Sequence, residues 1–348
     1  MCANKALLRL LRIIGSPLMS NSFQADKKLG NCHDLRLYSI AKVNKIPLTY
    51  LSTVNLQERK RLPEYYYHCS RLHRLIEVLV EICKLFDKKG INYVIFKTLR
   101  PYPEYVADID VLNAGSRNNY RKIVEVLKES GYLLMEEGAY CTTFRDYKTR
   151  FKTELMIDVY DEISVGHLIY LDKHKLNHYI VEKELPVGQV VRVFSPEAEL
   201  LVTIAHSVIK ENRFILAEYY ATLHYLAIMD QRVIERLIDL VRENKLVNAF
   251  RWHLTITATL HKLAFGLIPE KLSNLLSKLG GPWSRAYRQV LESAYPPYRC
   301  DPLTLMSIFR EKIQDSVFRR SLHSQIFSFP TRSFTRRLLA RLMNMWAT

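Results

Sequence analysis

The segment 94–113 constrains the fold of this chain more than any other. It reads VIFKTLRPYPEYVADIDVLN: a short apolar run, a loop with two prolines, and an Asp-Ile-Asp motif. Alternate side chains of a β-strand share a face, so Asp108 and Asp110 point the same way while Ile109 and Val111 point into the core. Two such carboxylates repel each other unless a positive charge lies between them, and Mg²⁺ or Mn²⁺ with oxygen ligands is the natural candidate.

A third acid lies in a later run with the alternation of a strand, ELMIDVY. Glu154 and Asp158 share one face of this run, and the other face is apolar. An acid flanked by apolar residues in a strand needs a reason to be there. We therefore expect Asp158 to lie beside Asp108 and Asp110, with Asp161 and Glu154 as substitutes. The alternative is a surface acid on an edge strand.

Helical patterns surround these strands. Apolar residues recur at helical spacing over 67–89 and predict a helix that ends before Gly90. The following NYVIFK predicts a buried strand. Ser116 is a suitable N-cap for a helix after the aspartates, and Ser195 followed by Pro196 marks the start of another helix.

These residues together resemble the polymerase-beta-like nucleotidyltransferase superfamily, in particular its uncharacterised bacterial and archaeal branch. In that branch a helix leads to a strand ending in Lys-Gly, then a loop, then Asp-Ile-Asp. The matching run here is GINYVIFKT, LRPYPEYVA and DIDVLN, and SPEAELLVTIAHSVIK is similar to the helix that opens the C-terminal region. The resemblance covers about residues 67–229. It implies an α+β fold: a small mixed nucleotidyltransferase-type sheet flanked by helices, with a mainly helical C-terminal domain.

The resemblance also implies an activity. Such an enzyme moves NMP from an NTP, here expected to be ATP, to an acceptor hydroxyl. Asp108, Asp110 and Asp158 would be the catalytic and metal-binding residues, holding Mg²⁺ or Mn²⁺ ions that activate the acceptor and bind the triphosphate. RNA, a protein side chain and a small molecule all stay open as the acceptor.

The phosphate-binding loop departs from the superfamily pattern. Members open this loop with Gly-Ser or Gly-Gly, whose backbone amides hold the triphosphate. This chain has Lys97-Thr98 and no glycine there. We expect Lys97, Thr98 and Arg100 to bind the nucleotide instead, with solvated loop charge as an equal alternative.

The domain boundaries follow from these patterns. Residues 1–66 are expected to form an N-terminal helical extension, 67–192 the nucleotidyltransferase-like domain, and 193–348 a helical C-terminal domain. His206 lies beside the apolar stripe of the helix after Pro196; we favour a hydrogen bond at a domain seam over contact with substrate. The final SFTRRLLARLMNMW predicts a closing helix, with RNA or a membrane surface as alternative contacts.

Composition narrows the partners and the location. The formal charge of +16 favours an anionic partner such as a nucleoside triphosphate, RNA, DNA or an acidic lipid surface. The six cysteines form no Cys-x-x-Cys pair, which is typical of reduced thiols. No apolar run is long enough for a transmembrane segment, and Arg9 and Arg12 interrupt the N-terminal apolar run, so we expect a cytoplasmic protein.

Two other functions stay open. The chain could be a catalytically degenerate nucleotidyltransferase-fold protein that acts as an RNA- or protein-binding, toxin–antitoxin-like module. The missing glycine pair favours that hypothesis, and the full set of acids favours catalysis. The third hypothesis is an incidental motif in a helical basic scaffold, which a structure without a sheet joining Asp158 to Asp108 would support.

Overall fold

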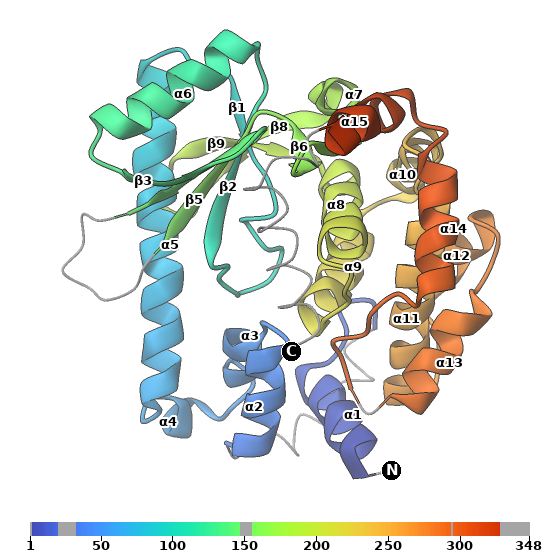
Figure 1. Cartoon of the computed structure of the whole chain (residues 1–348). Coiled ribbons are helices and arrows are strands. Elements are labelled where there is room, and N and C mark those ends of the chain that lie inside the picture. Colours follow the sequence, from blue (N-terminus) through green and yellow to red (C-terminus); the bar gives the residue numbers. More distant parts are fainter. Residues whose placement is uncertain (1, 20–32, 147–154, 294, 328–348) are drawn as a thin grey trace.

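A seven-stranded mixed sheet organises the first half of the chain in this computed structural model (Figure 1). The structure describes residues 2–19, 33–146, 155–293 and 295–327. The strands follow the order β3-β4-β5-β2-β1-β9-β8 across the sheet. Their bounds are β1 (Tyr93–Ile95), β2 (Asp108–Asn113), β3 (Leu133–Glu137), β4 (Cys141–Arg145), β5 (Met156–Tyr160), β8 (Ile180–Glu184) and β9 (Val190–Phe194).

The two strands that carry the predicted acids lie side by side at the middle of the sheet. β2 runs parallel to β5 and antiparallel to β1, and β4 is antiparallel to β5. A separate hairpin, β6 (Ile163–Val165) and β7 (Leu168–Leu171), follows β5. The register pairs Asp110 with Asp158, so both carboxylates project from the same face of the sheet.

Two helices, α5 (Pro63–Lys88) and α6 (Arg117–Glu129), cover one face of the sheet (Figure 1). Their apolar stripes bury Phe86 and Ile123 against Ile109 and Ile157 of the strands. Ser116 caps α6 by accepting a hydrogen bond from a backbone N–H of its first turn, as its sequence position predicts. Burial of these apolar side chains holds β2 in the register that exposes its aspartates on the opposite face.

The other face of the sheet packs against helices from both ends of the chain. The N-terminal helices are α1 (Cys2–Ile14), α2 (Leu35–Val43), α3 (Pro47–Leu51) and α4 (Leu56–Arg59). One continuous apolar cluster joins Leu7 of α1, Val94 of the sheet, and Leu201 and Trp252 of the C-terminal region. The N-terminal extension is therefore part of the core, next to the sheet face that carries the acids.

The C-terminal region is helical, as expected. It contains α8 (Pro196–Ala205), α9 (Leu216–Ile228), α10 (Gln231–Glu243), α11 (Val247–Phe265), α12 (Glu270–Lys278), α13 (Ser284–Glu292), α14 (Pro302–Lys312) and α15 (Ser316–Phe327). The last of these packs on β7, where Ser321 Oγ accepts the backbone N–H of Ile169 at 3.0 Å. No described helix is both long enough and apolar enough to span a membrane.

The predicted α+β class and mixed sheet are confirmed, with two local differences. Helix α5 begins four residues earlier than predicted, because Pro63 suits the first helical turn. Strand β3 was not predicted, since all five of its residues are exposed and give no alternation. The stretch after His167 forms β7, α7 (Lys173–Leu176), a 3₁₀ turn (Asn177–Tyr179) and β8. The final basic run lies outside the described residues.

Candidate active site

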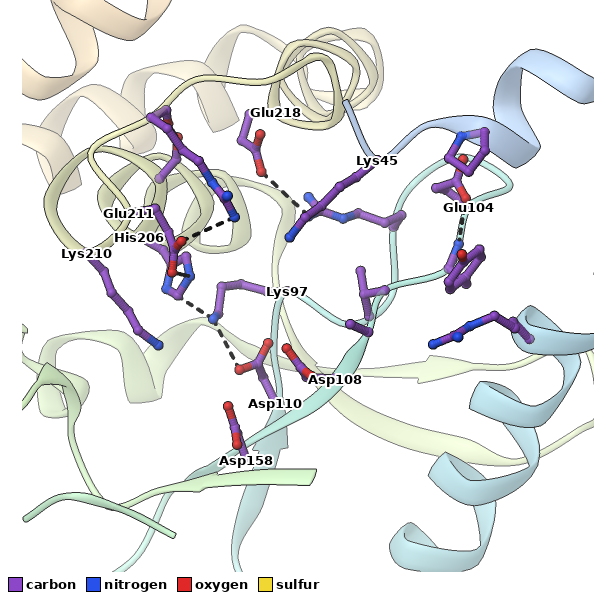
Figure 2. Close-up of a pocket in the computed structure, with 18 of the residues that line it drawn as sticks. Lys45, Lys97, Glu104, Asp108, Asp110, Asp158, His206, Lys210, Glu211 and Glu218 are labelled. Carbon is purple, nitrogen blue, oxygen red and sulfur yellow. Dashed lines mark hydrogen bonds and ion pairs between the residues drawn. The ribbon is translucent and has the colours of Figure 1, made fainter. Parts of the chain in front are cut away.

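A cavity of about 320 Å³ lies where the sheet meets the N-terminal and C-terminal helices (Figure 2). Its walls come from the α2–α3 junction, Arg71 of α5, the loop before β2, the strands β2 and β5, and the segment from His206, just after α8, to Glu218 of α9. Most of the lining residues are charged, and they bring together acids and bases that are far apart in the sequence.

The three predicted acids all line this cavity. Asp108 and Asp110 come from one face of β2, and Asp158 is the register partner of Asp110 on β5. Figure 2 shows the three carboxylates side by side. Thr143 on β4, opposite Asp158, donates a hydrogen bond of 2.6 Å to Asp158 Oδ1 and fixes its orientation.

Burial and mutual repulsion disfavour the ionised forms of Asp108 and Asp158. Burial, with repulsion from Asp110 and then Asp158, raises the pKa of Asp108 to about 6. Burial and the charge of Asp110 also raise the pKa of Asp158. A bound cation would stabilise carboxylates that are buried and repel each other. Carboxylate oxygens are also the ligands that Mg²⁺ and Mn²⁺ prefer.

The three carboxylates are chemically suited to bind such an ion, but they are not positioned to hold one in this structure. Within the described ranges, no three His, Cys, Asp or Glu side chains are arranged to hold a metal ion. A protein cation lies there instead: Lys97 Nζ is 3.2 Å from Asp110 Oδ1. Metal binding at these carboxylates therefore requires Lys97 to give up this ion pair.

Lys97 is held firmly in this position. Its backbone has φ +57°, an uncommon conformation for a residue with a side chain, and its N–H donates to the Glu199 carboxylate. Its ammonium also lies 3.2 Å from His206 Nδ1. Burial lowers the pKa of Lys97 although Asp110 opposes this shift. Lys97 is thus a buried cation aimed at the acids.

The two other predicted nucleotide-binding residues have different surroundings. Thr98 is buried and is not among the cavity-lining residues; its hydroxyl donates to the Phe96 carbonyl at 3.2 Å and accepts the Asp110 N–H at 2.9 Å. Thr98 therefore positions the start of β2. Arg100 does line the cavity, and its Nη2 lies 3.8 Å from Glu218 Oε1.

His206 lies at the seam between the sheet and the C-terminal helices. It opens a π-helical turn, His206–Lys210, a helix irregularity that often marks functional sites. Its Nδ1 is within 3.2 Å of the Tyr170 hydroxyl, and its Nε2 lies 3.6 Å from Glu211 Oε1. Burial, followed by repulsion from Lys97, lowers the pKa of His206 to about 3, so its ring is neutral at physiological pH. The expected hydrogen bonds at a seam are present, and the ring also lines the cavity.

Sequence reasoning missed several cations of this site, above all Lys45 and Arg213. Lys45 belongs to the α2–α3 junction and has φ +57°. It is exposed to the cavity, and no carboxylate of the described chain forms an ion pair with it. Partial burial and then repulsion from Arg213 lower the pKa of Lys45. No motif surrounds Lys45 in the sequence, and only the packing of the N-terminal extension brings it here.

Backbone conformation gives an independent signal for the same place. Four non-glycine residues in the described part of the chain have positive φ. Three of them, Lys45, Lys97 and Asn212, line the cavity or lie between residues that do. Uncommon backbone conformations cluster at functional sites because surrounding structure must hold them in place.

Comparison with known proteins assigns no family to the chain. No family profile matches it, and neither does any curated protein sequence. A solved structure that matches is JHP933 from Helicobacter pylori, at 11% sequence identity and a TM-score of 0.29, covering 66% of this chain and 95% of that chain. A similarity this low carries no argument about fold or function.

Proposed function

We propose that the protein is a metal-dependent nucleotidyltransferase that moves NMP from an NTP, ATP in the first instance, to an acceptor hydroxyl. The observation that supports this most is the presence of Asp108, Asp110 and Asp158 in one cavity with a set of cations. The acids suit a divalent cation, and the cations suit a triphosphate. The acceptor hydroxyl belongs to RNA, to a protein or to a small molecule. The reaction would take place in the cytoplasm, where NTP and Mg²⁺ are abundant.

The cations replace the missing glycine loop in this proposal. Lys45 forms no ion pair within the described chain, and Arg213, which pairs with Glu211 at 3.2 Å, lies close enough to Lys45 to repel it. The carboxylates of Glu218 and Glu211 oppose this repulsion, but the pKa of Lys45 stays lowered, so a further anion would stabilise the pair of cations. A triphosphate supplies that anion, and Arg100 is placed to bind it as well.

The acceptor oxygen attacks the α-phosphorus, a new phosphorus–oxygen bond forms, and the bond to the bridging oxygen breaks, so pyrophosphate leaves with that electron pair. Asp158 takes the hydroxyl proton. Its raised pKa makes it a better base than an ordinary aspartate. Thr143 donates to Oδ1 at 2.6 Å and the Tyr160 hydroxyl donates to Oδ2 at 3.4 Å, and these bonds orient the carboxylate.

Asp108, Asp110 and Asp158 would hold the divalent ion. Bound there, Mg²⁺ would offset the negative charge that accumulates on the phosphate oxygens and make the acceptor hydroxyl more acidic. The chain's own contribution is to keep the three carboxylates on one face of β2 and β5, and to keep cations on the opposite wall.

Calorimetric titration with a non-hydrolysable ATP analogue, with and without Mg²⁺, tests this proposal. We expect binding that depends on Mg²⁺ and is lost in the Asp108→Ala/Asp110→Ala double variant. Asp110→Asn should lose turnover with its fold intact, since it removes one charge and keeps the shape. An Asp110→Asn variant with full turnover, or a wild-type protein that binds no nucleotide, would contradict the proposal.

A second candidate function is a catalytically degenerate module on the same fold that binds RNA or protein. The ion pair of Lys97 with Asp110 favours it, because this pair neutralises a carboxylate without a metal. Binding of RNA that is indifferent to Mg²⁺, with no nucleotide binding, would favour this candidate.

A further inference from the structure

A second cavity, of about 230 Å³, adjoins the first on the far side of Asp158. Asp158, Tyr160 and Lys210 line both cavities. Tyr160 and Lys210 are joined by a hydrogen bond of 3.1 Å between Nζ and the phenol oxygen. Asp158 is therefore a shared wall that a molecule in either cavity can reach.

Apart from these shared residues, the second cavity is built from elements that the first does not use. Tyr140 and Cys141 line it from the β3–β4 turn and β4, and Gly166 and His167 come from the β6–β7 turn. The rings of Tyr140 and His167 meet edge to face, with centroids 6.3 Å apart. The backbone N–H of His167 donates to Gln325 Oε1 of α15 at 2.8 Å, so the C-terminal helix supports this wall.

We propose that this second cavity binds the acceptor, and that the acceptor presents a nucleoside whose ribose hydroxyl reaches Asp158. This inference rests on the proposed nucleotidyl transfer and adds the chemical class of the acceptor. The nucleoside is free or is the terminal unit of an RNA; both sources offer the same group to the cavity.

The arrangement of the two cavities suits an in-line transfer. In the view of Figure 2, Asp108 and Asp110 lie between Lys45 and Asp158. A triphosphate with its terminal phosphates toward Lys45 turns its α-phosphorus toward Asp158. The attacking hydroxyl must then arrive from the side opposite the leaving pyrophosphate, which is the side of the second cavity.

The lining of the second cavity suits a neutral, planar and hydroxylated group. Tyr140 and His167 are half-buried and offer ring surfaces on which a base can stack. Of the charged residues that line the cavity, Glu136 and Asp158 are acidic and Lys210 is basic, so the lining does not favour a polyanion inside the cavity. The volume has room for one nucleoside and not for a folded segment of protein.

Ala139→Trp tests the inference, since Ala139 is a half-buried cavity residue of the β3–β4 turn with no part in the first cavity. Ala139→Ser is the matched control. The measurement is binding of adenosine, and of a short single-stranded RNA with a free 3′ hydroxyl, to protein saturated with the ATP analogue and Mg²⁺. We expect the wild type to bind one of the two probes, and Ala139→Trp to weaken that binding about tenfold or more, the scale of one lost base–ring contact.

Affinity for the ATP analogue, measured alone, separates the two proposals. This affinity should be unchanged in Ala139→Trp, and an unchanged value also shows that the variant is folded. If Ala139→Trp does not fold, His167→Ala gives a second test, because it removes a ring without adding volume. Adenosine binding that exceeds RNA binding identifies a free nucleoside, and the reverse identifies an RNA end. Nucleotide binding with neither probe bound, or with label transferred to protein, overturns the acceptor inference alone. Absence of nucleotide binding overturns the proposed function and this inference with it.

Discussion

Lys97 places its ammonium 3.2 Å from Asp110 Oδ1, on the cavity side of the carboxylate cluster. His206 and Glu199 hold the side chain and the backbone of this lysine in place. The lysine thereby supplies the positive charge that the acids need before any ligand is bound. A divalent cation must compete with it, and a bound triphosphate would offer Lys97 another anion.

The first prediction concerns this competition. Lys97→Met removes the ammonium and keeps most of the side-chain volume, so Mn²⁺ should bind the nucleotide-free protein about tenfold more tightly, a free-energy change of about 1.4 kcal/mol. The electron paramagnetic resonance signal of free Mn²⁺ measures this affinity. Lys183→Met, on the exposed face of β8, is the control and should change nothing. Unchanged or weaker Mn²⁺ binding in Lys97→Met would show that Lys97 does not compete with the metal.

The second prediction separates binding from proton transfer. Asp158→Asn should retain affinity for the ATP analogue within a few fold, because Asp108, Asp110 and the cations of the opposite wall remain. Turnover should fall by about 10²-fold or more, since the amide cannot accept the hydroxyl proton. Thr143 can still donate to the amide oxygen, so the local structure should persist. Equal losses of binding and turnover would assign Asp158 to nucleotide binding instead.

The third prediction tests the contribution of the N-terminal extension. Lys45→Met should weaken binding of the ATP analogue about tenfold, because it removes a charge-assisted contact to phosphate. The loss should shrink as salt concentration rises, since salt screens the interaction that the wild type makes. Lys60→Met is the matched control on an exposed part of the same extension. Titration calorimetry at two ionic strengths measures both variants; equal affinities for Lys45→Met and the wild type would exclude this lysine from the nucleotide site.

The sequence predicted the acids of the site because their signal is local. Alternation of side chains in β2 and β5 is enough to place Asp108, Asp110 and Asp158 on cavity-facing positions, and burial of Ile109 and Ile157 on the other face confirms that alternation. The helices around the sheet were predicted for the same reason, because apolar periodicity and capping residues are local signals that can be found in the sequence.

The remainder of the site depends on packing between distant segments. Lys45 enters the cavity only because α1, α2 and α3 join the same core as α8 and α11. Lys97 is held beside Asp110 by a hydrogen bond from its backbone N–H to the side chain of Glu199, which is 102 residues away in the chain. Neither contact has a spacing or a pattern in the sequence, so neither could be predicted.

The junction between the N-terminal extension and the site contains a buried acid, Glu104. Its Oε2 accepts the backbone N–H of Thr49 at 3.1 Å and the Thr49 hydroxyl at 3.2 Å. Burial raises the pKa of Glu104 from 4.5 to about 7, although these hydrogen bonds oppose the shift. The ionised form is thus less favourable in the folded protein than in the unfolded chain.

The fourth prediction follows from the sign of this shift. Below about pH 4.5 Glu104 is protonated in both states and ionisation costs nothing, whereas above pH 7 it is ionised in both and the full penalty applies. Glu104→Gln keeps an oxygen that accepts the Thr49 bonds and cannot ionise. It should therefore be more stable than the wild type at pH 8, by roughly 2 kcal/mol, and about equal at pH 4. Urea unfolding at the two pH values measures this difference. A wild type that is the more stable protein at pH 8 would mean that the bonds from Thr49 outweigh the burial of the charge, and that this acid holds the N-terminal extension against the site.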